Sequence, residues 1–492
     1  MYYVSTRDKT LRYTAAQAIA QGLSRDGGLF LPERIPQLSA ADLDALTALP
    51  YAERAVRVMK LYLDEFSEDE LRTYAQKAYG ADKFDTPAVA PLTQLDDATA
   101  VLELWHGPTC AFKDMALQML PYLLTASLKK TGEEKTACIL VATSGDTGKA
   151  ALAGFCDVPH TKILVFYPDG GVSDIQKLQM VTQEGENVGV CAVKGNFDDA
   201  QTGVKQIFSD AQLREELAQR GCFFSSANSI NWGRVLPQIV YYISAWCDLR
   251  AAGRLAEGEE INFCVPTGNF GNILAAYYAK RMGLPVGRLI CASNANNVLT
   301  DFIQTGTYDR NRPFYTTESP SMDILISSNL ERLLYLLTDS DAVVRGYMEQ
   351  LRESGRYTVS DALRAAVAEN FSAGFCDDTG TEATIRAAFD GGYLPDTHTA
   401  VAWNVLGQYR AQTGDTRKSV IVSTASPFKF CASVLGALGC SEQAGGTAII
   451  SQLAELTGRA APAPLAGLAG KPVRFTGCVE RDEMTRAVRE ML

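Results

Sequence analysis

The stretch Ala137-Cys138-Ile139-Leu140-Val141-Ala142-Thr143-Ser144-Gly145-Asp146-Thr147-Gly148 indicates how this chain folds. Its opening run is short and apolar, as in a buried strand, and a glycine-containing loop then leads into an alanine-rich helix. A second apolar run, at residues 162–166, follows that helix. This order of strand, helix and strand predicts a parallel α/β unit.

Two further units repeat the order of strand, loop and helix. One runs from a strand at residues 261–265 through the loop Gly268-Asn269-Phe270-Gly271-Asn272 into a helix, and a strand at residues 288–292 follows. The other runs from a strand at residues 419–422 through a loop that contains Thr424 into a helix. Because ligands collect at the carboxyl ends of parallel strands, we expect the three loops to frame a single cleft.

Three regions are predicted along the chain. Residues 1–95 form an N-terminal region that is mostly helical in pattern and includes an amphipathic run at residues 52–78. Residues 96–220 form a smaller α/β domain that carries Lys113, and residues 221–492 form a larger α/β domain that carries the Gly268 loop. The expected fold class is therefore α/β, with two open, mostly parallel domains after a helical N-terminal region.

The composition is that of a globular protein with small-molecule chemistry. The 492 residues are 47% hydrophobic and 21% charged, which is enough for two or three domains with sizeable cores. A net charge of −11 argues against general binding to nucleic acid or to anionic membranes. The sequence shows neither a signal-peptide pattern nor an apolar run of about 20 residues, so we expect a cytoplasmic protein.

Cysteine and histidine usage speaks against disulfides and metal ions. The twelve cysteines lie singly, with no Cys-x-x-Cys pair, as reduced core cysteines do. The three histidines, His106, His160 and His398, are widely separated in the sequence. We therefore expect no metal site.

Lys113 is the strongest catalytic candidate. It lies in the segment His106-Gly107-Pro108-Thr109-Cys110-Ala111-Phe112-Lys113-Asp114, and at helical spacing it shares a face with Ala116, Leu117, Leu120 and Leu124. Burial on such a face disfavours the ammonium form, which lowers the pKa and suits a Schiff base to an aldehyde cofactor. The alternative is a lysine whose stem is buried and whose head reaches water. The sequence does not decide whether His106 makes a hydrogen bond within its loop or contacts a substrate or cofactor.

The loop at residues 268–272 is suited to a phosphate group. Gly268 and Gly271 allow backbone amides to approach a ligand, and the following helix presents its amino terminus to anions. The loop matches neither the Gly-x-Gly-x-x-Gly dinucleotide pattern nor the lysine-containing nucleotide loop. A tight connection without a ligand is the alternative.

The remaining loops supply hydroxyl groups and charges. Ser144 and Thr147 suit a carboxylate ligand and Asp146 suits a polar group of a cofactor, unless Ser144 and Asp146 only cap the helix. Thr424 is able to hydrogen-bond a heterocyclic nitrogen or to satisfy a turn. Arg234, at the end of the polar segment 225–234, suits a phosphate or carboxylate, with a surface salt bridge as the alternative.

Together these segments resemble threonine synthases, a branch of the fold type II, tryptophan-synthase-β-like family of pyridoxal-phosphate enzymes. The resemblance is long and covers residues 3–7, 26–32, 107–114, 143–148, 228–234, 266–272, 321–324, 328–329 and the turn at Thr424. Two positions depart from the wider pattern. Asp146 stands where the wider superfamily often has asparagine, and Ser426 stands where many relatives have histidine.

The resemblance implies pyridoxal 5'-phosphate as the cofactor and a role for each segment. Lys113 would bond the cofactor, Thr424 would meet the pyridine nitrogen, and the cofactor phosphate would be held by Gly268, Asn269, Phe270, Gly271 and Asn272. Asp146 would also face the cofactor. Ser144 and Thr147 would lie in the loop that receives the substrate carboxylate.

The reaction that the resemblance implies converts O-phospho-L-homoserine and water to L-threonine and phosphate, the last step of threonine biosynthesis and a carbon-oxygen lyase reaction on a phosphate. We predict that Asn231 and Arg234 help to bind the substrate phosphate. The expected partner is this small molecule, with no nucleic acid or membrane, for a monomer or homodimer. A phospholyase or a serine/threonine dehydratase with the same cofactor, and a nucleotide-binding kinase or ligand-binding module, are the alternatives.

Overall fold

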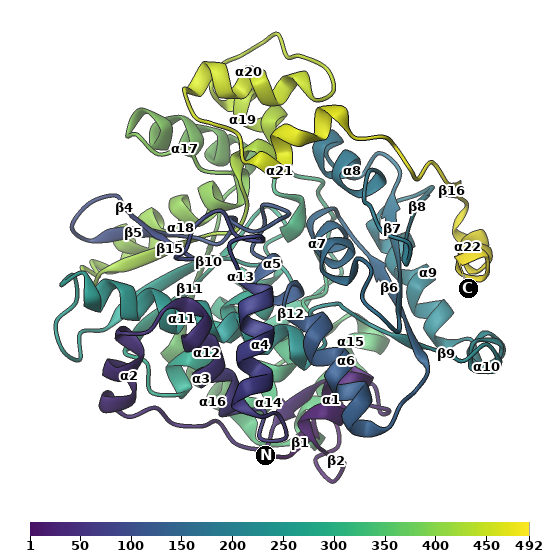
Figure 1. Cartoon of the computed structure of the whole chain (residues 1–492). Helices are drawn as coiled ribbons and strands as arrows, with labels where there is room; N and C mark the ends of the chain where they lie inside the picture. Colours follow the sequence, from purple (N-terminus) through teal and green to yellow (C-terminus); the bar gives the residue numbers. More distant parts are fainter. Residues whose placement is uncertain (492) are drawn as a thin grey trace.

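Two mostly parallel β-sheets organise the computed structural model, which describes residues 1–491 (Figure 1). Within the sheets only the pairing of β4 with β5 is antiparallel. The six-stranded sheet has the order β14 (Phe371–Phe375), β11 (Val286–Ser293), β10 (Ile261–Pro266), β15 (Ser419–Ser423), β5 (Thr99–Glu103), β4 (Leu92–Gln94). The five-stranded sheet has the order β16 (Cys478–Val479), β8 (Val188–Val193), β7 (Thr161–Pro168), β6 (Thr136–Ala142), β9 (Cys222–Ser225).

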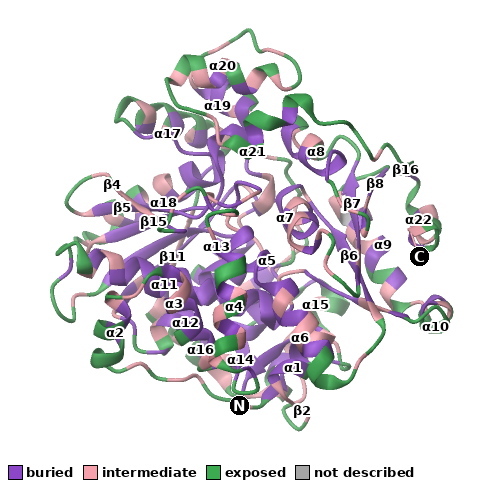
Figure 2. Ribbon diagram, viewed as in Figure 1, coloured by how far each residue is buried: buried purple, intermediate pink, exposed green. Residues whose placement is uncertain are grey.

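The predicted strands and the fold class are confirmed. The apolar runs that open the three units form β6, β10 and β15, and the expected return strands form β7 and β11. Helices lie on both sides of the strands, so both faces of these strands are buried (Figure 2). A strand that is covered on both faces requires a continuous apolar run, which explains why these strands are visible in the sequence.

The two sheets are not continuous segments of the chain. β5 pairs with β15 in the six-stranded sheet, although along the sequence it is followed, after one helical segment, by β6 of the five-stranded sheet. After α20 (Ala448–Thr457) the C-terminal segment passes through α21 (Ala463–Ala466) to β16, which pairs with β8, and ends in α22 (Met484–Met491) (Figure 1). The division at residues 96 and 221 stays a prediction. Strand pairing crosses residue 96 once, between β4 and β5, and crosses residue 221 three times, between β5 and β15, β6 and β9, and β8 and β16.

The N-terminal region contains more than the predicted helical pattern. The amphipathic run at residues 52–78 is two helices, α3 (Tyr51–Lys60) and α4 (Glu68–Ala78), because Ser67 starts α4 with a capping box to Glu70. The sequence analysis missed a small antiparallel sheet, whose strands are β2 (Arg12–Tyr13), β1 (Tyr3–Ser5) and β3 (Phe30–Pro32). Strands of two or three residues are too short to give an alternating pattern.

One long helix lies in the core and starts beside the functional site. In α11 (Trp232–Ala251), 17 of 20 residues are buried. A helix that is apolar on all sides is packed on all sides, and α11 is purple through most of its length in Figure 2. Its first turn carries Arg234. Among residues 1–491, the structure has no helix with the length and apolar character that a membrane span requires.

Candidate active site

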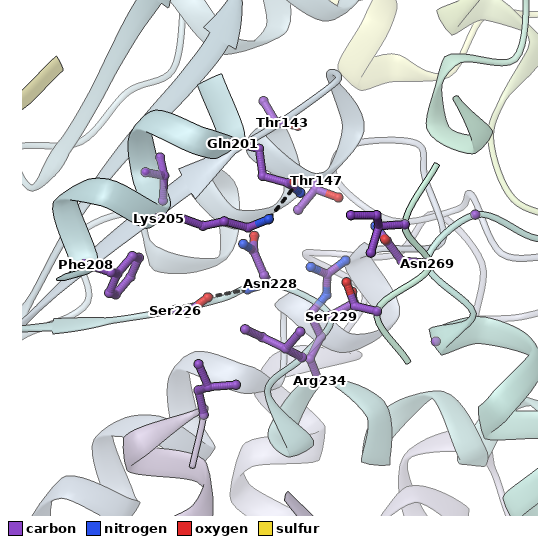
Figure 3. Close-up of a pocket in the computed structure, with 18 of the residues that line it drawn as sticks. Thr143, Thr147, Gln201, Lys205, Phe208, Ser226, Asn228, Ser229, Arg234 and Asn269 are labelled. Atoms are coloured by element: carbon purple, nitrogen blue, oxygen red, sulfur yellow. Dashed lines mark hydrogen bonds between the residues drawn. The ribbon is translucent and has the colours of Figure 1, made fainter. Parts of the chain in front are cut away.

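The three predicted loops meet at one cavity of about 1310 Å³. The loop after β6 contributes Thr143, Ser144 and Thr147, the loop after β10 contributes residues 266–272, and the loop after β15 contributes Thr424. Lys113 and Arg234 line the same cavity. Figure 3 shows the side chains of five residues that line this cavity, Thr147, Asn228, Ser229, Arg234 and Asn269. The expected single cleft is therefore present.

Lys113 stands just before a helix and not one turn inside it. The helix α5 (Asp114–Leu117) begins after Lys113 and ends at Gln118, and α6 (Leu120–Thr131) begins two residues later. Pro121 causes the break, because it has no backbone N–H for a bond to the carbonyl of Leu117. The prediction of one continuous apolar helix was wrong, although Ala116, Leu117, Leu120 and Leu124 are all buried as expected.

The Lys113 amine is nearly removed from water. The residue is 9% exposed, and its Nζ donates to Ser321 Oγ at 3.4 Å and lies 4.9 Å from the centre of the Phe112 ring. Burial lowers the pKa of Lys113 to about 8, against the opposing effect of the Asp146 carboxylate. A larger fraction of the neutral, nucleophilic amine is therefore present near neutral pH than for an ordinary lysine.

Asp146 is a buried carboxylate with two strong partners that the sequence analysis missed. Its Oδ1 accepts from Lys429 Nζ and from Gln176 Nε2, each at 2.8 Å. Burial alone would raise the pKa of Asp146, but Lys429 and Lys113 hold this pKa well below its ordinary value. Gly145 is the N-cap of α7 (Asp146–Phe155) and no side chain caps that helix, so capping does not explain Asp146.

The loop after β6 is shaped by Thr143. Its Oγ1 accepts from the backbone N–H of Gly145 at 3.0 Å and of Gly148 at 2.8 Å. The two bonds fix the turn, and they leave the partly exposed side chains of Ser144 and Thr147 at the cavity wall. Both hydroxyl groups are thus placed where a ligand in the cavity can reach them.

The loop after β10 brings backbone amides to the cavity. Phe270 has φ 61°, in the left-handed region, and directly precedes α12 (Gly271–Arg281). A Cβ at Gly268 would lie 2.6 Å from the carbonyl oxygen of Ser321, so this position requires glycine. Ser327 Oγ donates to the carbonyl of Gly268 at 2.7 Å, which holds the loop. The first amides of α12 have no carbonyl partner within the helix and are available to an anion.

Two buried donors at this end of the cavity have no partner among the described residues. These are Nδ2 of Asn272 and Nε of Arg234. Asn272 Oδ1 accepts from the hydroxyl groups of Tyr241 and Tyr242, which turns Nδ2 away from them. Burial lowers the pKa of Arg234 to about 10. Among residues 1–491 its Nη1 donates to the carbonyl of Ala227 at 2.9 Å, and no carboxylate is among the causes of its pKa shift. Unpaired buried donors are costly, so these groups fit an anionic ligand such as a cofactor or substrate phosphate.

The turn after β15 is joined to the lysine segment. The carbonyl of Thr424 accepts from the N–H of Phe112 at 2.8 Å, and the N–H of Ser426 donates to the carbonyl of Cys110 at 3.1 Å. These bonds hold Thr424 and Lys113 at the same cavity. Ser426 is fully buried, and its hydroxyl accepts from the N–H of Phe428 at 3.4 Å. Ser426 therefore starts the short 3₁₀ helix η2 (Pro427–Lys429) that delivers Lys429 to Asp146.

The structure does not bring Asn231 to the cavity wall. Its Nδ2 donates to the carbonyls of Ile19 at 3.1 Å and Ser226 at 3.2 Å, and its Oδ1 accepts from the N–H of Gly233 at 2.9 Å. All three bonds are to the backbone, and Asn231 is the N-cap of α11. We correct the predicted substrate contact: the amide of Asn231 is occupied in holding the start of the helix that carries Arg234.

The two histidines near the site have different places. His106 lies between Asp85, at 2.6 Å, and Glu103, at 3.0 Å, and does not line the cavity. Burial would lower the pKa of His106, but these two carboxylates raise it. Of the two alternatives that the sequence left open for His106, these contacts favour the loop hydrogen bond over a ligand contact.

His398 lines the cavity and was not singled out from the sequence. Its Nδ1 lies 2.9 Å from Asp396 Oδ1, and its Nε2 accepts from the N–H of Ser321 at 3.2 Å. His398 thereby holds the backbone of Ser321, whose hydroxyl group accepts the hydrogen bond from Lys113 Nζ. The signal in the sequence was an aspartate two residues before a histidine at the start of an apolar helix, α18 (Thr397–Thr413).

Comparison with known families matches most of the chain. A model described as "Pyridoxal-phosphate dependent enzyme" matches residues 85–425, and a model described as "Threonine synthase N terminus" matches residues 2–79. The longer range contains Lys113, the loop at residues 268–272 and Thr424.

Individual relatives agree with these families. "Threonine synthase-like 1" of Homo sapiens is 40% identical over 439 residues, which are 87% of this chain and 58% of that protein, so the chain spans less than two thirds of its length. "Threonine synthase" of Saccharomyces cerevisiae is 36% identical over 468 residues, 89% of each chain. The crystal structure of PLP-bound threonine synthase from Brucella melitensis is 38% identical, with a TM-score of 0.88 over 100% of this chain and 99% of that one.

Proposed function

Because this chain belongs to the threonine synthase family of pyridoxal-phosphate-dependent enzymes, we propose that it converts O-phospho-L-homoserine and water to L-threonine and phosphate. The cofactor is pyridoxal 5'-phosphate. The observation that supports the proposal most is one cavity that joins a buried lysine of lowered pKa to two unpaired buried donors. The lysine suits an aldehyde, and the donors suit phosphate groups.

The residues of the cavity divide between the cofactor and the substrate. For the cofactor we assign Lys113 to the aldehyde, Asp146 to a polar ring substituent and Thr424 to the ring nitrogen. The cofactor phosphate is assigned to the loop Gly268, Asn269, Phe270, Gly271 and Asn272, whose amides and whose Asn272 Nδ2 fit an anion. When bound, pyridoxal phosphate withdraws electrons from the substrate amino acid and so makes its Cα and Cβ protons removable.

For the substrate we assign the carboxylate to Ser144 and Thr147 and the phosphate to Arg234. The Arg234 guanidinium is planar and buried, and its Nη1 is anchored on the carbonyl of Ala227 at 2.9 Å, which leaves Nε for the ligand. A single fixed cation at this place orients the phosphate, and it balances the charge that develops when the phosphate leaves Cγ.

Lys113 then moves the protons. Displaced by the substrate amine, its neutral Nζ takes one proton from Cα and one from Cβ, phosphate leaves from Cγ, and a proton is delivered to Cγ, which becomes the methyl group of threonine. Water adds at Cβ, and the Lys113 ammonium returns a proton to Cα. Ser321 Oγ, 3.4 Å from Nζ and supported by His398, keeps the amine directed into the cavity. A pKa near the working pH suits a group that both takes and gives a proton.

Product analysis tests this function against its alternatives. Purified protein is incubated with O-phospho-L-homoserine, and phosphate, threonine and 2-oxobutyrate are measured. We expect phosphate and threonine in equal amounts and no 2-oxobutyrate. Phosphate with 2-oxobutyrate instead of threonine would assign a phospholyase. Formation of 2-oxobutyrate from added threonine, or of pyruvate from added serine, with no phosphate release from O-phospho-L-homoserine, would assign a dehydratase.

We also propose a cytoplasmic location and a monomer or homodimer. In support of the location, all twelve cysteines are free and most are buried, as in a reducing compartment. Immunofluorescence or fractionation tests the location, and light scattering of the purified protein tests the assembly.

A further inference from the structure

The two oxygens of Asp146 have different partners. Oδ1 accepts from Lys429 Nζ and Gln176 Nε2 at 2.8 Å each, whereas Oδ2 faces Lys113 Nζ at 3.9 Å. Asp146 is 3% exposed and Lys429 is fully buried. A carboxylate thus lies between two buried ammonium groups, one in close contact and one slightly farther away.

Lys429 has no route to water and is held in place by two acceptors. Its Nζ donates to the carbonyl of Thr109 at 2.8 Å, in addition to Asp146. Burying an ammonium group is costly unless it is paired and hydrogen-bonded, and here both conditions are met. The proposed chemistry assigns no task to Lys429, so its presence beside the catalytic lysine requires an explanation.

Lys429 matters for the state in which Lys113 has lost its proton. With Lys113 as the only partner, deprotonation would leave Asp146 as a lone buried anion, which is unfavourable. The other charged groups that face this pair are Arg234 from α11, Asp114 from α5 and His398 from α18. Arg234 and Asp114 act on Lys113 at longer range. Among the charged groups that surround the pair in residues 1–491, only Lys429 is in hydrogen-bond contact with the Asp146 carboxylate.

We propose that Lys429 is a positioning residue that serves as the permanent counter-charge of Asp146, so that Lys113 releases its proton without leaving an unpaired buried carboxylate. Lys429 also fixes the carboxylate orientation, because it and Gln176 occupy Oδ1 and leave Oδ2 for the Lys113 side. Ser426 contributes by starting the 3₁₀ helix that ends in Lys429. The inference rests on the proposed function in one respect, the identity of Lys113 as the nitrogen that bonds the cofactor.

The test is a pH titration of the visible absorbance of the cofactor-loaded protein, which reports the proton on the Lys113 nitrogen and not activity. Lys429→Met removes the counter-charge, and we expect the midpoint to rise by about one pH unit or more, as for a lost like charge within a buried cluster. Asp146→Asn removes the anion, and we expect the midpoint to fall. Lys60→Met is the matched control, because Lys60 also donates to backbone carbonyls but lies outside the cavity; its midpoint should stay unchanged.

A midpoint that is unchanged or lower in Lys429→Met, in protein with wild-type circular dichroism, overturns the proposal. If Lys429→Met does not fold, Asp146→Asn decides: a midpoint that fails to fall shows that this carboxylate does not act on Lys113. A second readout separates this inference from the proposed function. In cofactor-free protein, the pH dependence of Lys113 carbamylation by cyanate, measured by mass spectrometry, should shift in the same directions even if the substrate is not O-phospho-L-homoserine.

Discussion

Lys113 Nζ lies 3.9 Å from Oδ2 of Asp146, so an amine at the cavity wall faces a carboxylate that is buried behind the wall. The two residues come from separate segments of the chain, and both are buried, with 9% of Lys113 and 3% of Asp146 exposed. The separation exceeds a hydrogen bond, so the carboxylate acts on the amine through its charge and leaves Nζ free to bond an aldehyde.

Replacement of Arg234 by alanine should raise KM for O-phospho-L-homoserine by roughly 10- to 100-fold, the usual effect of losing a charge-assisted hydrogen bond to a ligand. Steady-state phosphate release measures it. Arg254→Ala is the control, because Arg254 is an exposed arginine 3.5 Å from Asp97. An unchanged KM in Arg234→Ala would remove Arg234 from the substrate-phosphate site.

Replacement of Gly268 by alanine should weaken cofactor binding at least about tenfold, because the new Cβ would lie 2.6 Å from the carbonyl oxygen of Ser321 and the phosphate loop must move. Fluorescence titration of cofactor-free protein with pyridoxal phosphate measures it. Gly346→Ala is the matched control, because no atom lies within 4 Å of the position of its Cβ and helix α15 (Asp341–Ser354) tolerates alanine. Equal affinities in the two variants would contradict the assignment of the loop.

The rate at which cofactor-free protein takes up pyridoxal phosphate should rise with pH and level off above about 8. The neutral amine of Lys113 is the nucleophile, and burial lowers the pKa of this residue to about 8, so the neutral fraction increases tenfold per pH unit below that value. Stopped-flow absorbance from pH 6 to pH 9.5 measures the profile. A rate that keeps rising tenfold per pH unit up to pH 9.5 would show that Lys113 has an ordinary lysine pKa.

Replacement of Asn231 by alanine should lower stability and leave substrate affinity unchanged. The change removes the N-cap of α11 and leaves the carbonyls of Ile19 and Ser226 without this donor, at a cost of about 1–3 kcal/mol. Urea unfolding measures the stability, and KM measured at a temperature where the variant is folded provides the comparison. A large rise in KM without loss of stability would restore Asn231 to the substrate site.

The sequence predicted what depends on neighbouring residues. The run at residues 261–265 became β10 (Ile261–Pro266) because a strand covered on both faces must be apolar throughout. The Gly268 loop was visible because glycine at position 268 is a direct requirement of close backbone packing. The break between α5 and α6 was also encoded locally, in Pro121, but the apolar spacing on both sides of it resembled a single helix.

Features that depend on distant contacts escaped the prediction. Lys429 lies 283 positions and Gln176 lies 30 positions after Asp146 in the sequence, and no local pattern couples these three positions. Asn231 lies in a polar segment with Arg234, which suggested a shared ligand, yet its amide bonds to the backbone of the N-terminal region. The pairing of β5 with β15 likewise joins segments that are far apart along the chain.

The most direct test of the account is to find which lysine bonds the cofactor. The loaded protein is reduced with borohydride, digested and analysed by mass spectrometry, beside Lys113→Ala treated in the same way. We predict the pyridoxyl phosphate mass on Lys113 alone and no labelled peptide in Lys113→Ala. A label on Lys429 or another lysine, or a visible cofactor band that persists in Lys113→Ala, would contradict the central claim.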